Sequence, residues 1–238
     1  MKIAIIGYGK MGKAIEEIAI NKGHEIILKI NSQNLADFTK ENLQKADVCI
    51  EFTTPHTAFE NVKRCLEAGV PTVCGSTAWL EKLEEAKQIA IDNHTAFLYA
   101  SNFSIGVNLF FKINKMVATI MEKHPEYQVS MEEIHHTHKK DAPSGTAVTL
   151  AEGILENYAT KNKWVNEVTN QANELSIISK RIDPAPGTHT IFYQSEIDEI
   201  SINHTAHSRI GFASGSVLAA EFLHTKKGIF TMNDVLHL

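Results

Sequence analysis

The glycine-rich turn near the start of the sequence limits the possible folds more than any other feature. Residues Lys2 to Ile6 form a short apolar run rich in β-branched side chains, which predicts a buried parallel strand. The next residues, Gly7-Tyr8-Gly9-Lys10-Met11-Gly12, fit G-x-G-x-x-G, and apolar positions at helical spacing follow from Lys13. In such a turn the first glycine permits the bend, the second lets the backbone approach a pyrophosphate, and the third brings helix against strand. The sequence therefore predicts a dinucleotide-binding turn at a helix N-terminus.

An alternation of strands and helices continues beyond this turn. Strand-like segments recur at residues 25–30, 46–52, 70–74 and 96–100, and helical segments are expected at 57–68 and 81–93. Crossovers of this length join parallel strands, so the pattern predicts a Rossmann-type, doubly wound parallel sheet of the α/β class. This context favours the dinucleotide interpretation of the glycine turn over a turn retained for packing alone.

The pattern changes after about Ser104. Helical segments are expected at 108–123 and 146–158, and strand-like segments at 128–134, 174–181, 188–195 and 199–206. Consecutive strands predict a mixed or antiparallel sheet, and hence a second domain of the α+β type. The tail from Ser216 to Leu238 is expected to form a helix followed by a short segment.

Composition excludes several classes of protein. Of the 238 residues, 43% are hydrophobic and 21% are charged, as is typical of folded globular proteins. Lys and Arg number 23 against 28 Asp and Glu, a formal charge of −5, so the chain lacks the basic field that a nucleic acid or an anionic membrane would require. The three cysteines, Cys49, Cys65 and Cys74, lie in separate apolar segments and are expected to be reduced thiols. No apolar run approaches the length of a membrane span, and we expect a cytoplasmic protein.

Segments rich in small residues follow three of the predicted strands, at the carboxyl edge where doubly wound sheets bind ligands. The candidate cofactor contacts in these segments are Phe52, Gly75, Ser76, Thr77, Ala100, Ser101, Asn102 and Phe103. The second strand ends in Leu28-Lys29-Ile30-Asn31 and lacks the acidic residue that usually binds the ribose hydroxyls of NAD. Either Lys29 attracts the 2′-phosphate of NADPH, or it is a solvated surface lysine. The expected cofactor is therefore NADPH or NADH.

The most unusual segment runs from Glu133 to Ala147. Three histidines and two lysines lie within His135–Lys140, and a helix start follows at Pro143-Ser144-Gly145-Thr146. A metal site is disfavoured, because Cys or carboxylate partners at ligand spacing are lacking and the lysines repel a cation. A solvated polar loop and an anion site remain, and in the second the amides of the helix start bind a carboxylate beside titratable imidazoles. The anion site accounts for more of the segment, because imidazole and ammonium groups can also give protons.

Together these motifs resemble the 4-hydroxy-tetrahydrodipicolinate reductase family, also called dihydrodipicolinate reductase. The resemblance extends nearly end to end and is most specific in Glu133-x-His135-His136-x-x-Lys139-x-Asp141-x-Pro143-Ser144-Gly145-Thr146-Ala147. The other matching segments are 7–12, 52–55, 75–77, 100–108, 204–209 and 228–236. The sequence departs from the family's pattern by shortened stretches between Lys29 and Ala46 and between Tyr158 and Glu174.

The resemblance implies an enzyme of the diaminopimelate route to lysine, which uses NADH or NADPH to reduce a dicarboxylate, 4-hydroxy-tetrahydrodipicolinate, to tetrahydrodipicolinate and water. It implies a Rossmann domain from residues 1–104 and 210–238, and a substrate domain from 105–209 whose mixed, open sheet associates into a homotetramer. By motif, His135 is the expected general acid, and Lys139 a second proton donor or charge stabiliser. The expected substrate contacts are His136, Gly145 and Thr146, and no metal is expected. The expected cofactor contacts are Gly7 to Gly12, Gly75 to Thr77 and Ala100 to Phe103.

Two other functions fit part of the sequence. Another NAD(P)-dependent dehydrogenase of a small amino or keto acid, such as aspartate dehydrogenase, would share the Rossmann half but would not require the segment from Glu133 to Ala147. A protein that senses NAD(P)H without turnover would not require the clustered proton donors, and the chain has no basic DNA-binding motif. Both alternatives leave the most specific motif unexplained.

Overall fold

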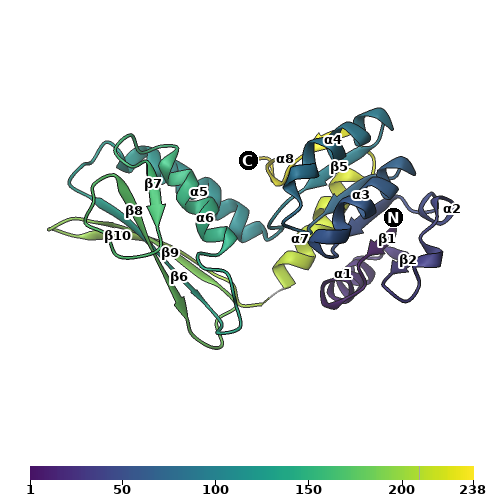
Figure 1. Ribbon diagram of the computed structural model, residues 1–238, viewed down its shortest axis with the longest axis horizontal. Coiled ribbons are helices and arrows are strands. Elements are labelled where there is room, and N and C mark those ends of the chain that lie inside the picture. Colours follow the sequence, from purple (N-terminus) through teal and green to yellow (C-terminus); the bar gives the residue numbers. More distant parts are fainter. Residues whose placement is uncertain (209) are drawn as a thin grey trace. The chain divides into compact units, whose positions relative to one another are not determined.

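A six-stranded parallel sheet forms the framework of the first of two units in the computed structural model, in the order β11-β5-β4-β3-β1-β2 (Figure 1). The structure describes residues 1–208 and 210–238, and the chain divides into Met1–Ile105 with Ile210–Leu238 as one unit and Gly106–Arg209 as the other. The strands of this sheet are β1 (Lys2–Ile6), β2 (Glu25–Ile30), β3 (Val48–Glu51), β4 (Thr72–Cys74), β5 (Ala96–Tyr99) and β11 (Gly228–Phe230). The predicted doubly wound parallel sheet is therefore confirmed, with β11 as an edge strand that the sequence analysis had not identified.

Helices cover both faces of this sheet. Their bounds are α1 (Lys10–Asn21), α2 (Lys40–Leu43), α3 (Pro55–Glu67), α4 (Leu83–Asp92), α7 (Ile210–Leu223) and α8 (Met232–Leu236), with short 3₁₀ turns η1 (Leu35–Asp37) and η2 (Leu80–Lys82). Alternate residues of β1 enter different cores, because successive side chains of a strand point to opposite faces. Ile3 and Ile5 pack with α1 and α7, whereas Ala4 and Ile6 pack with α3. The sheet is thus buried on both sides, as a parallel sheet requires.

The second unit contains a mixed five-stranded sheet in the order β10-β9-β6-β8-β7. Its strands are β6 (Gln128–His135), β7 (Lys163–Val165), β8 (Glu174–Arg181), β9 (Thr188–Gln194) and β10 (Glu199–Thr205). The central strand β6 runs parallel to β8 and antiparallel to β9, so the predicted mixed sheet is confirmed. Helices α5 (Ile105–Met121) and α6 (Gly145–Leu155) pack on one face of it, through Phe110, Leu150 and their neighbours.

Burial alternates along β6, because only one of its faces lies under the helices. Val129 and Met131 enter the apolar core, and Glu133 and His135 continue the same inward row as polar residues. The opposite face carries the half-buried Ser130, and no helix is packed on it in the described part of the unit. The change from apolar to polar along one buried row places the candidate site at the carboxyl end of β6.

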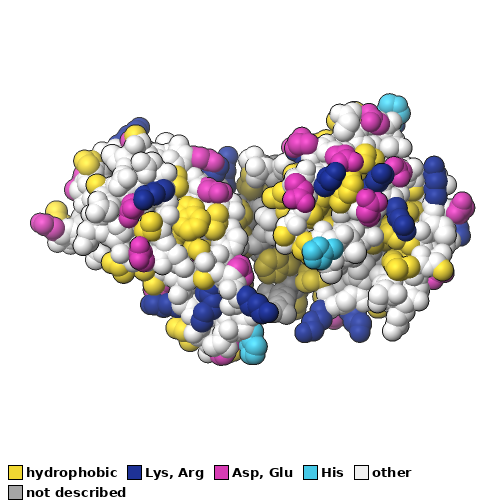
Figure 2. All heavy atoms as spheres, viewed as in Figure 1, with side chains coloured by type: hydrophobic (Ala, Val, Ile, Leu, Met, Phe, Trp, Pro, Cys, Tyr) yellow, Lys and Arg dark blue, Asp and Glu magenta, His cyan; other side chains and the backbone are white. Residues whose placement is uncertain are grey.

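The surface of the molecule agrees with its balanced charge. On the face shown in Figure 2, basic and acidic side chains are interspersed over each unit. Among the described residues, no helix is both long enough and apolar enough to cross a membrane.

Candidate active site

The glycine turn of the first unit has the close backbone contacts that its motif predicts. Gly7 has a φ of +101°, and a Cβ there would lie 2.0 Å from the carbonyl oxygen of Phe52. A Cβ on Gly12 would lie 2.6 Å from the carbonyl oxygen of Gly7. At Gly9, by contrast, a Cβ would meet no heavy atom within 4 Å, so this residue borders open space. Only glycine fits the tight packing at positions 7 and 12, and the missing side chain at Gly9 leaves this face of the turn open.

The N-terminus of α1 has free space and no side-chain cap among the described residues. Gly9 is its N-cap, the first turn holds no acidic residue, and no described side chain caps it by a hydrogen bond. Exposed helical amides of this kind attract phosphate through their hydrogen bonds and the helix dipole. The residues present therefore fit the pyrophosphate of a dinucleotide, with Gly7 to Gly12, including Tyr8, Lys10 and Met11, around it.

The loops after β3 and β4 are joined by a buried carboxylate. Glu51 accepts hydrogen bonds from the Thr53 amide at 3.0 Å, the Ser76 hydroxyl at 3.1 Å and the Cys74 thiol at 3.0 Å. Burial raises the pKa of Glu51, and these hydrogen bonds only partly oppose that effect. Ser76 is 5% exposed, and its hydroxyl donates to Glu51 inside the protein. Thr77, in contrast, is exposed.

The other predicted cofactor residues lie at the same edge of the sheet, in different settings. A Cβ on Gly75 would lie 2.2 Å from the Phe52 ring, which packs at 5.7 Å between centroids against Phe103. Phe103 is 1% exposed and belongs to the core, so only its backbone is available to a ligand. Ala100 is half-buried, Ser101 is exposed, and the side-chain oxygen of Asn102 accepts a hydrogen bond from the Ser104 amide at 2.8 Å.

Lys29 is exposed at the surface and paired with an acid. Its ammonium lies 3.1 Å from the Glu16 carboxylate and 5.0 Å from the centre of the Tyr8 ring. The Tyr8 hydroxyl donates a hydrogen bond to the same carboxylate. The hydrogen bond with Glu16 raises the pKa of Lys29 and keeps it charged. The end of β2 has no acidic residue of its own, and Glu16 of α1 lies beside it in contact with Lys29.

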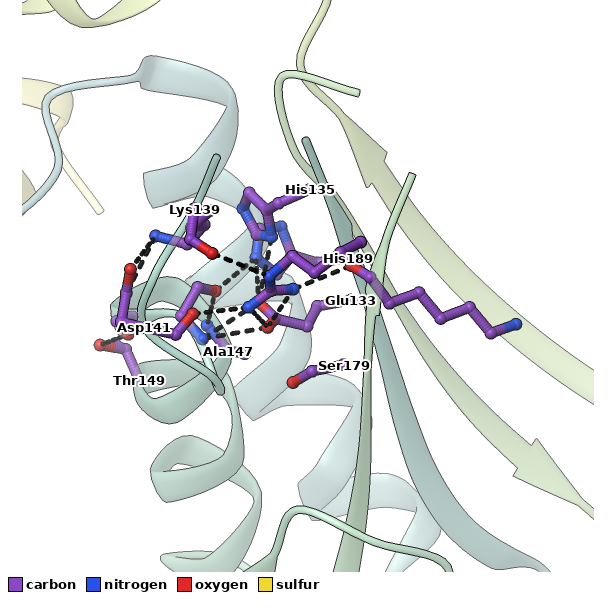
Figure 3. A network of polar contacts seen from close by, with 12 residues as sticks. Glu133, His135, Lys139, Asp141, Ala147, Thr149, Ser179 and His189 are labelled. Carbon is purple, nitrogen blue, oxygen red and sulfur yellow. Dashed lines mark hydrogen bonds and ion pairs between the residues drawn. The ribbon is translucent and has the colours of Figure 1, made fainter. Parts of the chain in front are cut away.

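In the second unit, the buried Glu133 holds the candidate catalytic segment together (Figure 3). Its carboxylate accepts two hydrogen bonds of 3.1 Å from the Ser144 amide, and Arg181 donates to it from Nη1 at 3.3 Å and Nη2 at 3.2 Å. His135 Nδ1 lies 3.2 Å away, at ion-pair distance. Burial alone would raise the pKa of Glu133, but contacts with His135 and Ser144 outweigh it and lower that pKa. Glu133 is therefore an anion whose charge is shared among three partners.

Lys139 lies on the loop that covers Arg181. Its ammonium is 2.9 Å from both carboxylate oxygens of Asp141. Arg181 donates to the backbone carbonyls of Asp141 at 2.5 Å and Lys139 at 3.4 Å, which fixes the loop from beneath. The predicted charge stabiliser is thus held next to the Glu133 cluster, with its own charge balanced by Asp141.

His136 and His138 are not part of the group formed by Glu133, His135 and His189. Their ring centroids are 6.1 Å apart, and His136 lines a cavity of about 320 Å³ together with Asp183 and Pro184. Thr137 between them donates to Asp183 from its amide at 3.1 Å and its hydroxyl at 2.6 Å. The His135, His136 and His138 imidazoles thus do not converge on one point, which argues against a metal site built from this segment.

Among the described residues, another set of side chains has ligand atoms close enough together to hold a metal ion. Ligand atoms of Glu133, His135 and His189 lie within 4.8 Å of one another. The Arg181 guanidinium already binds the Glu133 carboxylate, however, and its positive charge opposes a second cation there. The arrangement suits proton chemistry better than metal binding.

The start of α6 is the place where the sequence predicts an anion site. Ser144 is the N-cap, and its hydroxyl accepts a hydrogen bond from the Ala147 amide at 3.2 Å. Gly145 is exposed, and a Cβ on it would meet nothing within 4 Å. The first turn, which includes Thr146, contains no acidic residue. A ligand carboxylate can therefore approach these amides without steric or electrostatic opposition.

Sequence reasoning included Glu133 in the matching motif but gave it no role, and it missed Arg181 and His189 as parts of this site. Glu133 shares the inward parity of Val129 and Met131 on β6, and His189 shares that of Ile191 and Tyr193 on β9. A polar residue at an inward strand position is the signal that would have identified both. Residue 209, which ends one of the segments that resemble the family, lies outside the described residues.

Comparisons with known proteins match both units. The family model for dihydrodipicolinate reductase, N-terminus, matches residues 1–103, and the model for its C-terminus matches residues 106–236. A 4-hydroxy-tetrahydrodipicolinate reductase from Christiangramia forsetii is 47% identical over 240 residues, which is 99% of this chain and 98% of that relative. A solved structure of dipicolinate-bound dihydrodipicolinate reductase from Paenisporosarcina sp. TG-14 matches 97% of each chain with a TM-score of 0.79 and 26% identity. An amine dehydrogenase from Mycobacterium smegmatis matches with a TM-score of 0.61 at 11% identity, over 97% of this chain and 94% of its own, and shares the fold alone.

Proposed function

The chain belongs to the dihydrodipicolinate reductase family, and we propose that it catalyses the NAD(P)H-dependent reduction of 4-hydroxy-tetrahydrodipicolinate to tetrahydrodipicolinate in lysine biosynthesis. The observation that carries this proposal is the buried cluster at the end of β6, where His135 and Lys139 lie beside the anion site of α6. The reaction needs a proton donor and a binding site for a dicarboxylate, and this cluster offers both.

The first unit holds the cofactor in this proposal. NADH or NADPH, when bound, supplies a hydride. Gly7 to Gly12 hold its pyrophosphate at the start of α1, because the Gly9 face is open and the helical amides have no described side-chain cap. Gly75, Thr77 and the backbone of residues 100–103 border the same carboxyl edge of the sheet, where doubly wound folds bind nicotinamide.

His135 is the general acid. Loss of the substrate hydroxyl gives an unsaturated imine, which accepts hydride at C4 and must then be protonated at C3. The Glu133 carboxylate lies 3.2 Å from Nδ1 of the imidazole, so we assign the proton transfer to the other ring nitrogen, Nε2. Each turnover therefore transfers one proton from His135 Nε2 to carbon, and solvent restores it.

The two carboxylates of the substrate need separate positive sites. Gly145 and Thr146 bind one through the amides of α6, which no acidic residue opposes in that turn. Lys139 and His136 lie on the preceding loop, and we assign them to the second carboxylate and to the developing negative charge. For this role Lys139 exchanges Asp141 for the substrate, and the exchange conserves an ion pair.

We further propose that the chain uses both NADH and NADPH. Lys29 attracts a 2′-phosphate, but Glu16 repels it and accepts hydrogen bonds from ribose hydroxyls, so neither cofactor is strongly favoured. Replacing Glu16 by Gln should lower the Kd of NADPH relative to that of NADH by about tenfold, and Lys29→Glu should shift the ratio in the opposite direction. Fluorescence titration with each cofactor measures both ratios, and unchanged ratios would reduce the pair to a surface contact.

The open face of the second sheet is the proposed assembly surface, and we expect a cytoplasmic homotetramer. Ser201 and Asn203 of β10 are exposed, and no described helix covers this side of the sheet. Light scattering after size exclusion measures the mass directly. A monomer at micromolar concentration would contradict this part of the proposal.

A coupled assay tests the function itself. Purified protein receives NADPH or NADH together with substrate made freshly by a dihydrodipicolinate synthase from pyruvate and aspartate semialdehyde. Loss of NAD(P)H absorbance that requires both precursors supports the proposal. Dinucleotide binding without such oxidation would contradict it and favour a different acid substrate or a sensor.

A further inference from the structure

A second histidine lies beneath the catalytic one. His189 is on β9, directly opposite Glu133 of β6 in the antiparallel register, and it is 4% exposed. Because opposed residues of neighbouring strands point to the same face, both side chains enter the polar end of the buried row (Figure 3). Neither the motif that resembles the family nor the proposed chemistry assigns His189 a role.

His189 is hydrogen-bonded to the anion site. Its Nε2 lies 3.1 Å from the hydroxyl of Ser144, the N-cap of α6. That hydroxyl also accepts from the Ala147 amide, and the Ser144 amide donates to Glu133. These three hydrogen bonds thus fix the position of Ser144, and the one with His189 comes from β9.

His189 also supports the catalytic imidazole. The rings of His135 and His189 meet edge to face, with centroids 5.1 Å apart and an interplanar angle of 73°. On the other side, a Cβ on Gly187 would lie only 3.0 Å from His135 Nε2. The His135 ring is therefore held between the start of β9 and the Glu133 carboxylate.

The charge of His189 matters for this support. Burial lowers its pKa to about 4, with the nearby charges of His135, Glu133, His204 and Lys139 as smaller influences of both signs. His189 is therefore neutral near neutral pH and does not repel a protonated His135. A neutral ring with a hydrogen-bonding nitrogen is the one side chain that satisfies both contacts.

We infer that His189 is a positioning residue that holds the His135 imidazole with its ring and the carboxylate-binding start of α6 with its Nε2. The inference rests on the proposed function and adds a structural link between its acid and its anion site. The two contacts are made by different parts of one side chain, so two substitutions can separate them.

His189→Phe keeps a ring against His135 but cannot bind Ser144. We expect KM, and the Kd of dipicolinate measured by calorimetry, to rise about tenfold, while kcat changes less than about threefold. His189→Gln keeps an amide within reach of Ser144 but removes the ring. We expect kcat to fall about tenfold with KM nearly unchanged.

The control is Tyr193→Phe, a conservative change on the same buried face of β9. The Tyr193 hydroxyl is buried without a partner, so its loss should leave kcat, KM and dipicolinate binding unchanged. Ser144→Ala provides a second route to the anion-site effect if His189→Phe proves unstable. The double variant His189→Phe/Ser144→Ala should bind dipicolinate no more weakly than Ser144→Ala, because Ser144→Ala already breaks the hydrogen bond that His189→Phe removes.

The outcomes separate this inference from the proposed function. If the wild type is active and the two His189 variants change kcat and KM in step, or change neither more than twofold, the positioning role is overturned. If the wild type is inactive but binds dipicolinate, the proposed reaction fails, and the binding arm with His189→Phe still decides the link to Ser144.

Discussion

Replacing Glu133 by Gln tests the central claim about the site, because it removes one charge and leaves the shape almost unchanged. The oxygen of the new amide can still accept from Arg181 or the Ser144 amide. Its NH₂ group must then face either the Arg181 guanidinium, whose hydrogen bond the carboxylate accepted, or His135 Nδ1, which lies 3.2 Å from the carboxylate. If the NH₂ group faces His135, it donates to Nδ1, and the neutral imidazole then carries its proton on Nε2. The protonated imidazole, in turn, no longer has a carboxylate as its counter-ion.

The magnitudes follow from those contacts. Breaking a fully buried ion pair costs about 3–5 kcal/mol. Because the Arg181 side chain is 21% exposed, we expect a smaller loss of unfolding free energy, about 2–3 kcal/mol. At about 2–4 °C per kcal/mol this lowers Tm by about 4–12 °C. Loss of the orienting carboxylate of a catalytic histidine lowers kcat by about 10²- to 10⁴-fold.

The assay compares kcat, Tm and NADH affinity for Glu133→Gln with those of Glu156→Gln. Glu156 follows α6 in the same unit and pairs with Lys115 of α5 at 2.5 Å, and both side chains are about half exposed. The control should change Tm by less than about 2 °C and kcat by less than about twofold, because surface ion pairs contribute little. NADH affinity should be unchanged in both. A Glu133→Gln enzyme with kcat within about threefold of wild type would refute the orienting role.

Three further predictions are independent of that variant. His135→Gln should lower kcat by about 10²- to 10⁴-fold with NADH affinity intact, and unchanged turnover in the coupled assay would remove His135 from the role of acid. Gly9→Ala should fold as stably as wild type but bind NADH at least about tenfold more weakly. Gly12→Ala should also lose about 1–3 kcal/mol of stability, because its Cβ would meet the Gly7 carbonyl oxygen at 2.6 Å. Equal Tm values for the two variants would contradict this reasoning. Burial lowers the pKa of His189 from 6.5 to about 4 in the folded protein, so the folded state binds a proton more weakly than the unfolded state. The contribution of His189 to stability is therefore complete above pH 6.5 and is lost as pH falls toward 4, by about 3 kcal/mol in all. Urea unfolding from pH 7 to pH 4 should show this loss in wild type and a smaller one in His189→Phe, and identical pH dependences would show that His189 does not titrate as described.

The parts of the fold predicted correctly from sequence are those determined by neighbours along the chain. The strand, glycine turn and helix from Lys2 to Asn21 are specified by local periodicity and by the steric needs of Gly7 and Gly12. The mixed sheet followed from the order of strand-like segments. The edge strand β11 was missed because it is short and its pairing with β5 is remote in sequence.

The parts of the site that escaped prediction depend on pairings between distant segments. The two interpretations of Lys29 both omitted Glu16, because the contact requires α1 to lie against the end of β2. His189 became part of the site only through the register of β9 on β6, which a single sequence does not specify. Ser76 stays a predicted cofactor contact, and the sequence did not indicate that its hydroxyl donates to Glu51, a buried acid that no motif marks.

The path of the chain has a consequence for how the protein is made. The first unit is completed only by residues from Ile210 onward, since α7 contributes Ala213, Val217 and Leu223 to the core on one face of its sheet. During synthesis the strands of residues 1–105 leave the ribosome long before that helix exists, with one apolar face of the sheet covered only in part, by α1. The second unit, whose chain is continuous, can close earlier. We therefore expect nascent chains that stop before α7 to be bound by chaperones or degraded, even though every residue of the glycine turn is already present.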